Sequence, residues 1–136
     1  FGLYNWRGGG GSIWFAPVSQ AKGSETLKQM QLAKRILGKH GFDYVGEFVG
    51  WRDMHHVIDL LFDRSDAEQT KQAYACYEEL LQTFAAAGYG VYRASTAFAE
   101  KVAATYGPVK RDVEKRLKKA LDPNNIIAPG RCGISL

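Results

Sequence analysis

Three ionisable side chains, Glu47, His55 and Asp59, fall in two stretches that otherwise have the composition of β-strands. Residues four apart on a regular strand point to the same face, so His55 and Asp59 share one, and Glu47 lies on the neighbouring strand of the expected hairpin. Charged groups in an apolar sheet are costly to bury unless they are paired or take part in chemistry. The pattern fits a site for acid–base chemistry and a paired structural cluster about equally well.

A second group of polar side chains could bind an anion. Tyr92 and Arg93 follow a glycine-flanked aromatic residue, and Arg131 lies in the segment APGRCG, where Pro129 and Gly130 impose a turn. A phenol O–H and two guanidinium groups would all donate to an oxyanion if they converged. Spacing alone does not bring them together, and surface arginines beside a core tyrosine are the alternative interpretation.

Other chemistry-bearing patterns are weaker. The run Gly8–Gly11 lacks the Lys-Ser/Thr pair of a phosphate-binding loop and is followed by a strand pattern, which favours a turn. His55 and His56 are adjacent, so on a strand they point to opposite faces and cannot hold one metal together. Cys76 and Cys132 lack the spacing of a zinc or redox motif. No metal site is predicted.

Composition is that of one globular domain: 136 residues, 46% hydrophobic and 24% charged, with a net charge of +4. No apolar run approaches the roughly 20 residues of a membrane span, which predicts a soluble protein and no membrane partner. Basic residues gather between Lys110 and Lys119, where interleaved acidic residues favour a solvated helix face over a nucleic-acid surface. The chain starts at Phe1, so we expect it to be part of something longer.

The elements that must position these residues follow from hydrophobic spacing and from capping and breaking residues. Their order is a split β-α-β-β-α-β arrangement with two further helices, which predicts an α+β fold with an antiparallel sheet and helices on one face. In chain order, we expect a strand at Ser12–Val18 that ends at Pro17 as an edge or terminal strand would, a helix capped by Ser24 and ended by Gly38 and Gly41, a hairpin of Phe42–Val49 and His55–Phe62, a helix from Asp66 to Gly88, a strand at Tyr89–Arg93, and helices at Thr96–Tyr106 and from Pro108 to Leu121.

Four segments carry a resemblance to a known family. In chain order they read GGGGSIWFAPVS, RDMHHVIDLLFDR, GYGVYR and LDPNNIIAPGRCGI. Together they resemble the C-terminal region of the vanillyl-alcohol oxidase/p-cresol methylhydroxylase flavoprotein family, from about Tyr4 to the end of the chain. The resemblance implies that residues 1–136 form the cap, or substrate, domain of an FAD-linked oxidase whose FAD-binding domain lies N-terminal to residue 1.

The resemblance also implies an activity, the oxidation and hydroxylation of 4-alkylphenols. A hydride leaves the benzylic carbon of the phenolate for the flavin, and water adds to the resulting quinone methide. Two alternatives remain open: an oxygen-using oxidase of the same family and, in another class, a basic split β-α-β-β-α-β module that binds nucleic acid. A nucleic-acid partner is the less favoured, because the expected sheet carries acidic side chains.

Site roles follow from the same motifs. Tyr92 and Arg131 match the residues that hold the phenolate, with Arg93 beside them near the flavin or phenolate. Because adjacent strand residues diverge, Tyr92 and Arg93 can both line one pocket only if the strand ends or bulges there.

The residues around the substrate's alkyl end are the ionisable group from the hairpin. Glu47, His55 and Asp59 match positions there, and Asp59 is the best candidate for the base that helps water to add, with Glu47 and His55 tuning it by charge and hydrogen bonding. Trp14 matches an aromatic residue close to the substrate, although its position is equally compatible with the core.

Flavin attachment distinguishes the branches of this family. The oxidase branch carries a histidine just before the aromatic strand, where this chain has Ser12, and the methylhydroxylase branch uses a tyrosine that Tyr4 matches. Covalent FAD on Tyr4 is therefore expected, with a cytochrome c subunit as the electron acceptor. The resemblance further implies a homodimer of flavoprotein subunits and a periplasmic location.

Overall fold

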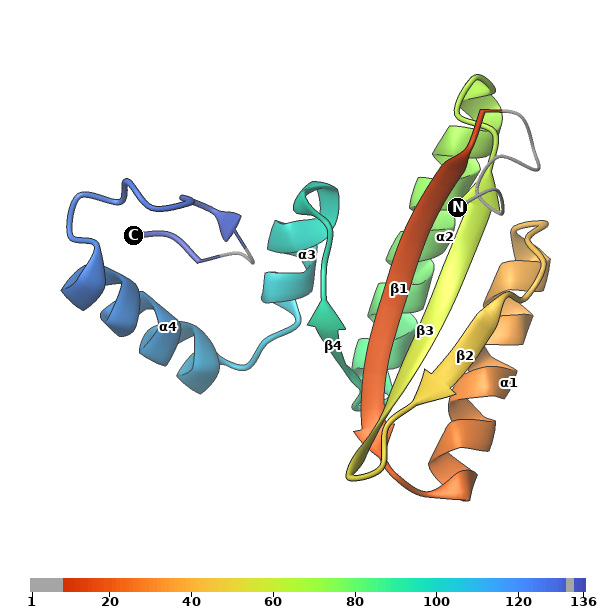
Figure 1. Ribbon diagram of the computed structural model, residues 1–136, viewed down its shortest axis with the longest axis horizontal. Helices are drawn as coiled ribbons and strands as arrows, with labels where there is room; N and C mark the ends of the chain where they lie inside the picture. Colours follow the sequence, from red (N-terminus) through yellow and green to blue (C-terminus); the bar gives the residue numbers. More distant parts are fainter. Residues whose placement is uncertain (1–8, 132–133) are drawn as a thin grey trace. The chain divides into compact units, whose positions relative to one another are not determined.

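The computed structural model describes residues 9–131 and 134–136. The chain divides into two compact units, one up to Arg93 and the other from Ala94 to Leu136, and each is described by itself (Figure 1).

The first unit is a four-stranded antiparallel sheet with two helices. Its elements are β1 (Gly11–Gln20), α1 (Gly23–Lys39), β2 (Gly46–Val49), β3 (Asp53–Phe62), α2 (Ala67–Ala86) and β4 (Gly90–Arg93). The strand order is β2-β3-β1-β4, and every neighbouring pair is antiparallel. This confirms the split β-α-β-β-α-β topology and the α+β class.

Both long helices cover the same face of this sheet (Figure 1). Phe15 on β1 is completely buried there, with its ring centroid 5.4 Å from that of Tyr77 and 5.1 Å from that of Phe84, both on α2 and both edge-to-face. Ile58 and Leu60 on β3 are equally inaccessible. Since a fully buried side chain of this size stabilises the fold by about 1.5–3 kcal/mol, the hydrophobic core lies on this face.

The strand β1 is central in the sheet and continues to Gln20, so the expectation that it ends at Pro17 as an edge or terminal strand is wrong. Pairing with β3 runs from Gly11–Phe62 to Phe15–Ile58 and resumes at Val18–His55. Pro17 falls in this break of the β1–β3 ladder, while on its other side it pairs with Val91 of β4, so its missing N–H coincides with the interruption of the pairing with β3.

The helix ends test the predicted caps. Asp66 caps α2 as expected, since its carboxylate accepts hydrogen bonds from the backbone N–H groups of Glu68 and Gln69 at 2.9 and 3.1 Å. Ser24 does not cap α1: the N-cap is Lys22, whose side chain makes no capping bond. Leu27 on α1 is about half exposed, because the buried face of this helix is centred on Gln29, Ala33, Ile36 and Leu37.

The second unit contains a short 3-10 helix, η2 (Thr96–Phe98), which runs directly into α3 (Ala99–Ala104), and then α4 (Pro108–Leu121). Pro108 lies in the first turn of α4, as predicted. Ion pairs on α4 join Lys110 to Glu114 and Arg116 to Asp112, which supports the solvated-face interpretation of its charges. In the described part of the chain no helix is long and apolar enough to cross a membrane.

Asp122 organises the turn that follows α4. Its carboxylate is buried and accepts hydrogen bonds from the backbone N–H groups of Ile126 and Ile127 at 2.9 and 2.8 Å, and from the Lys118 ammonium at 2.5 Å. These bonds hold the pKa of Asp122 below its usual range. One carboxylate therefore fixes the turn that leads into the segment around Arg131.

Candidate functional site

The first set of site residues lies on the sheet face opposite α1 and α2, here called the open face. Strand register places Trp14 opposite Asp59, Val18 opposite His55, and Glu47 opposite Val57. Phe15 and Ile58 point to the helices, so their alternate neighbours point the other way. The open face thus carries four of the predicted site residues: Trp14, Glu47, His55 and Asp59.

A register shift between β1 and β4 adds two more. Ala16 pairs with Arg93 but Pro17 pairs with Val91, so β4 contains one extra residue, Tyr92, at this point. Val91 is buried, while Tyr92 and Arg93 are both exposed. The irregularity required for both side chains to line one pocket is therefore present.

Contacts show where those two side chains point. The Tyr92 ring stacks on His55 with centroids 4.4 Å apart, and the Arg93 guanidinium lies 5.4 Å from the centre of the Trp14 ring. Both partners belong to the open face. Six of the predicted residues are thus gathered on one surface of the first unit.

Asp59 is the most enclosed ionisable group of this surface, with 8% of its area exposed. Burial raises the pKa of its carboxyl group, and hydrogen bonds from the Ser12 hydroxyl, at 2.5 Å, and from Trp14 oppose that rise. A carboxylate with a raised pKa is a stronger base than an exposed one. Sequence reasoning missed the contact of Ser12, although strand alternation already placed Ser12 and Trp14 on one face.

His55 and Glu47 are more accessible. The His55 Nε2 lies 2.9 Å from the Asp53 carboxylate, and this hydrogen bond lowers the pKa of Asp53. Glu47 is exposed. Among the described residues no hydrogen bond or ion pair joins Glu47, His55 and Asp59 to one another, so each keeps bonding capacity for a ligand.

His56 belongs to the opposite face. It is fully buried, its Nε2 lies 2.8 Å from the Tyr44 hydroxyl, and its ring stacks on Phe48 at 4.0 Å. Burial lowers the pKa of His56 to about 4, so the ring is neutral at neutral pH. The two adjacent histidines therefore diverge as predicted, and the described residues contain no group of three or more potential metal ligands.

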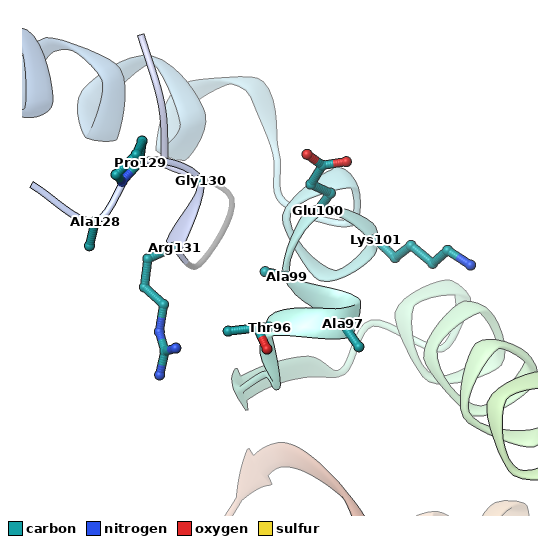
Figure 2. A pocket seen from close by; sticks show the side chains of 9 residues that line it. All are labelled: Thr96, Ala97, Ala99, Glu100, Lys101, Ala128, Pro129, Gly130 and Arg131. Carbon is teal, nitrogen blue, oxygen red and sulfur yellow. The ribbon is translucent and has the colours of Figure 1, made fainter. Parts of the chain in front are cut away.

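Arg131 lies in the second unit, at a hollow of about 520 Å³ between η2–α3 and the C-terminal segment. Figure 2 shows the Arg131 side chain extending from the C-terminal segment, and the Thr96 side chain pointing from η2 toward the side of the hollow where Arg131 lies. Gly130 has a φ of 77°, and its N–H donates to the Ile134 carbonyl at 2.9 Å, while the Arg131 N–H donates to the Ala128 carbonyl at 3.1 Å. The left-handed turn explains the glycine. Because Arg131 and Tyr92 belong to different units, their convergence stays a prediction.

The chemistry of the open face fits a flat aromatic group with a negative oxygen. Trp14 and Tyr92 are 39% and 46% exposed, which offers ring surface, and the Tyr92 hydroxyl and Arg93 guanidinium are donors. A phenolate or an isoalloxazine ring matches this donor set. Tyr4, the predicted flavin attachment point, lies outside the described residues, as does Cys132.

Comparisons with known proteins agree with this chemistry. Residues 21–132 match the family model described as FAD linked oxidases, C-terminal domain. The chain is 64% identical to the 4-cresol dehydrogenase [hydroxylating] flavoprotein subunit of Pseudomonas putida over its whole length, which is 26% of that protein. It is 31% identical, over 89% of its length and 23% of the relative's, to a 1'-carboxy-chondrochloren decarboxylase of Chondromyces crocatus.

Solved structures give the same picture. A crystal structure of p-cresol methylhydroxylase with substrate bound matches 99% of this chain and 26% of its own, with a TM-score of 0.93 and 63% identity. A 4-ethylphenol oxidase from Gulosibacter chungangensis, in complex with isoeugenol, matches 98% of this chain and 26% of its own, with a TM-score of 0.91 and 39% identity. The chain spans about a quarter of the length of these relatives.

Proposed function

Since the chain belongs to the C-terminal domain family of the FAD-linked oxidases, we propose that it is the substrate domain of a flavoenzyme that oxidises and hydroxylates 4-alkylphenols. The observation that carries the proposal is the open face, where Trp14, Tyr92 and Arg93 lie beside Asp59 and His55. The similarity to a 4-cresol dehydrogenase over the whole chain supports the same reaction class.

The phenol binds as its phenolate, with Tyr92 and Arg131 donating to the oxygen and Arg93 adding positive charge. Negative charge on that oxygen drives the departure of a hydride, the benzylic hydrogen with its electron pair. Preorganised donors aimed at the phenolate therefore act as an oxyanion hole does. FAD, when bound, supplies the hydride acceptor.

Loss of the hydride oxidises the substrate by two electrons and converts it into a quinone methide. Water then forms a C–O bond at the benzylic carbon while Asp59 takes one of its protons, and the ring oxygen recovers its negative charge. The raised pKa of Asp59 suits this role, because a general base works best when its pKa lies near the operating pH. Glu47 and His55 adjust its charge environment, and Trp14 lines the alkyl end.

The parts of the enzyme outside these residues complete the proposal. An FAD-binding domain N-terminal to residue 1 is supported by the greater length of the relatives. Attachment of FAD to Tyr4 and a cytochrome c subunit as electron acceptor are supported by the tyrosine at position 4 and by Ser12 in place of a histidine. A homodimer and a periplasmic location rest on the family resemblance alone.

An oxygen-using oxidase is the second candidate function, favoured by the similarity to a 4-ethylphenol oxidase. The two differ in the electron acceptor. Oxygen uptake and reduction of cytochrome c, measured in parallel with 4-cresol as substrate, separate them: fast oxygen uptake without added cytochrome would replace the dehydrogenase by the oxidase.

The main test removes the phenolate donors in the complete enzyme. We expect Tyr92→Phe and Arg131→Ala each to lower kcat for 4-cresol by about 10²–10³-fold, since that is the usual loss for one oxyanion donor. Circular dichroism and flavin content should stay those of the unmodified enzyme.

Tyr106→Phe and Arg116→Ala are the matched controls, because the Tyr106 ring faces Lys110 and Arg116 pairs with Asp112 on α4. Both should keep normal rates. Near-normal rates in Tyr92→Phe and Arg131→Ala would refute the site assignment, and a complete protein that binds no flavin would refute the enzyme.

A further inference from the structure

Ser12 contacts the proposed base directly, and no role follows for it from the proposed reaction. We propose that Ser12 is a positioning residue that keeps the Asp59 carboxylate ionised and fixed for the addition of water, an inference that rests on the proposed function. Ser12 would then decide what becomes of the oxidised substrate rather than how fast it is oxidised.

The geometry of the contact is that of a strong hydrogen bond. The Ser12 hydroxyl donates to Asp59 Oδ1 at 2.5 Å, at the short end of the range for a hydroxyl on a carboxylate. Trp14, directly across from Asp59, donates to the same group. Two donors from alternate residues of one strand therefore hold a carboxylate that is almost entirely enclosed.

The start of β1 is fixed, which gives Ser12 a defined position. Gly11 pairs with Phe62, whose ring occupies the space of a Cβ at Gly11, 2.6 Å away. Just upstream, the Gly9 carbonyl accepts from Arg64 Nε at 3.1 Å, and the Gly9 N–H donates to the Asp63 carboxylate. The start of β1 is thus held at Gly9 and Gly11. These contacts oppose a shift of the β1–β3 register, which would carry Ser12 away from Asp59.

The chemical consequence concerns one proton. Only the ionised carboxylate can take a proton from water, and burial favours the protonated form. A hydroxyl that donates to the carboxylate stabilises the charged form and restricts its rotation. Without Ser12, Asp59 is more often protonated and less well aimed, whereas the departure of the hydride, which depends on the phenolate donors, is unaffected.

A 4-ethyl substrate makes this distinction measurable. Its quinone methide either adds water to give the alcohol or moves a proton from the methyl carbon to the ring oxygen to give 4-vinylphenol, a route that needs no activated water. The ratio of alcohol to vinylphenol therefore reports water activation separately from hydride loss.

The experiment uses the complete flavoenzyme with Ser12→Ala, Ser12→Thr and, as matched control, Ser19→Ala on the same strand, whose hydroxyl donates to the Gln20 carbonyl at 3.2 Å. We expect Ser12→Ala to lower the alcohol-to-vinylphenol ratio roughly tenfold, the effect of about one hydrogen bond to a charged group. The acid limb of the pH profile for alcohol formation should move to higher pH, while flavin reduction stays within about twofold.

Ser12→Thr, which keeps the hydroxyl, should restore both, and Ser19→Ala should behave as the unmodified enzyme. An unchanged ratio and pH profile in Ser12→Ala would refute the inference. So would a tenfold loss of flavin reduction, because it would make Ser12 part of the hydride step.

A titration without substrate separates this inference from the proposed function. Carbon-13 NMR of labelled aspartate, with the Asp59 signal assigned through Asp59→Asn, should show a higher pKa of Asp59 in Ser12→Ala. An equal pKa in the two proteins would refute the positioning role. If the unmodified enzyme did not reduce its flavin with any 4-alkylphenol, the proposed function would fail while this titration still stood.

Discussion

The two faces of the sheet are built from the same strands but differ in role: one packs against the helices, and the other carries the candidate site. On β3, Ile58 and Leu60 are sealed under the helices, whereas His55 and Asp59 face away from them. Even the two neighbouring histidines differ: His56 is a neutral core side chain, and His55 stacks on an exposed tyrosine. Strand alternation alone thus separates the residues that hold the fold from those that do the chemistry.

The largest expected effect tests that separation on adjacent residues of β1. Phe15→Ala removes a fully buried ring and should lower the free energy of unfolding by about 3–5 kcal/mol. Trp14→Ala, one residue away on the open face, should lower it by less than about 1 kcal/mol and instead raise KM for 4-alkylphenols. Urea denaturation of the complete protein, followed by circular dichroism, gives both values. Equal losses would mean that the open face is a second core.

The histidine pair offers a test by pH. The pKa of His56 falls to about 4 in the folded protein, against 6.5 unfolded, so the unfolded chain binds more protons between these values. The contribution of His56 is therefore complete above pH 6.5 and is lost as the pH falls towards 4, by about 2–3 kcal/mol.

Urea denaturation at several pH values between 4 and 7 measures this loss. In His56→Gln, which keeps a neutral polar group beside Tyr44, this part of the pH dependence should disappear, while in His55→Gln it should persist. If the stability of His56→Gln fell between pH 7 and 4 as much as that of the unmodified protein, His56 would not be held neutral by burial.

The smallest effect concerns the layer that covers the core. Asp66→Ala removes the cap of α2 and should cost about 1 kcal/mol of stability. Because α2 packs only on the helix face, kcat per folded molecule should not change. Thermal unfolding measures the loss of stability, and a turnover assay measures kcat. A lower kcat in the folded protein would show that the two faces are coupled.

Much of this division could be predicted from the sequence, because its signals are local. Asp66, Gly88 and Pro108 mark helix ends through capping, positive φ and the missing N–H. The order of the strands and helices along the chain then predicts the topology. His55 and Asp59 share a face through a spacing that any strand obeys. The family motifs supplied the chemistry of the open face.

What sequence reasoning missed depends on contacts between strands. A proline is typical of an edge strand, yet Pro17 lies in the central strand β1. It is tolerated there because the pairing of β1 with β3 is interrupted at that point. The contact of Ser12 with Asp59 joins residues 47 apart in the chain and requires the β1–β3 register. The sequence predicts that the strand must be irregular at Tyr92 if Tyr92 and Arg93 are to line one pocket. It does not predict that the register shift falls opposite Ala16 and Pro17 of β1.

The extra residue in β4 makes the site depend on the length of the chain as well as on its composition. It changes the phase of the strand, so that Val91 points inward while both Tyr92 and Arg93 point outward. Deleting Tyr92 would restore strict alternation, with Val91 opposite Pro17 and Arg93 opposite Ala16, and would leave the open face with one of these two polar side chains instead of both. Among natural or engineered variants, substitutions along this strand should therefore be far better tolerated than insertions or deletions.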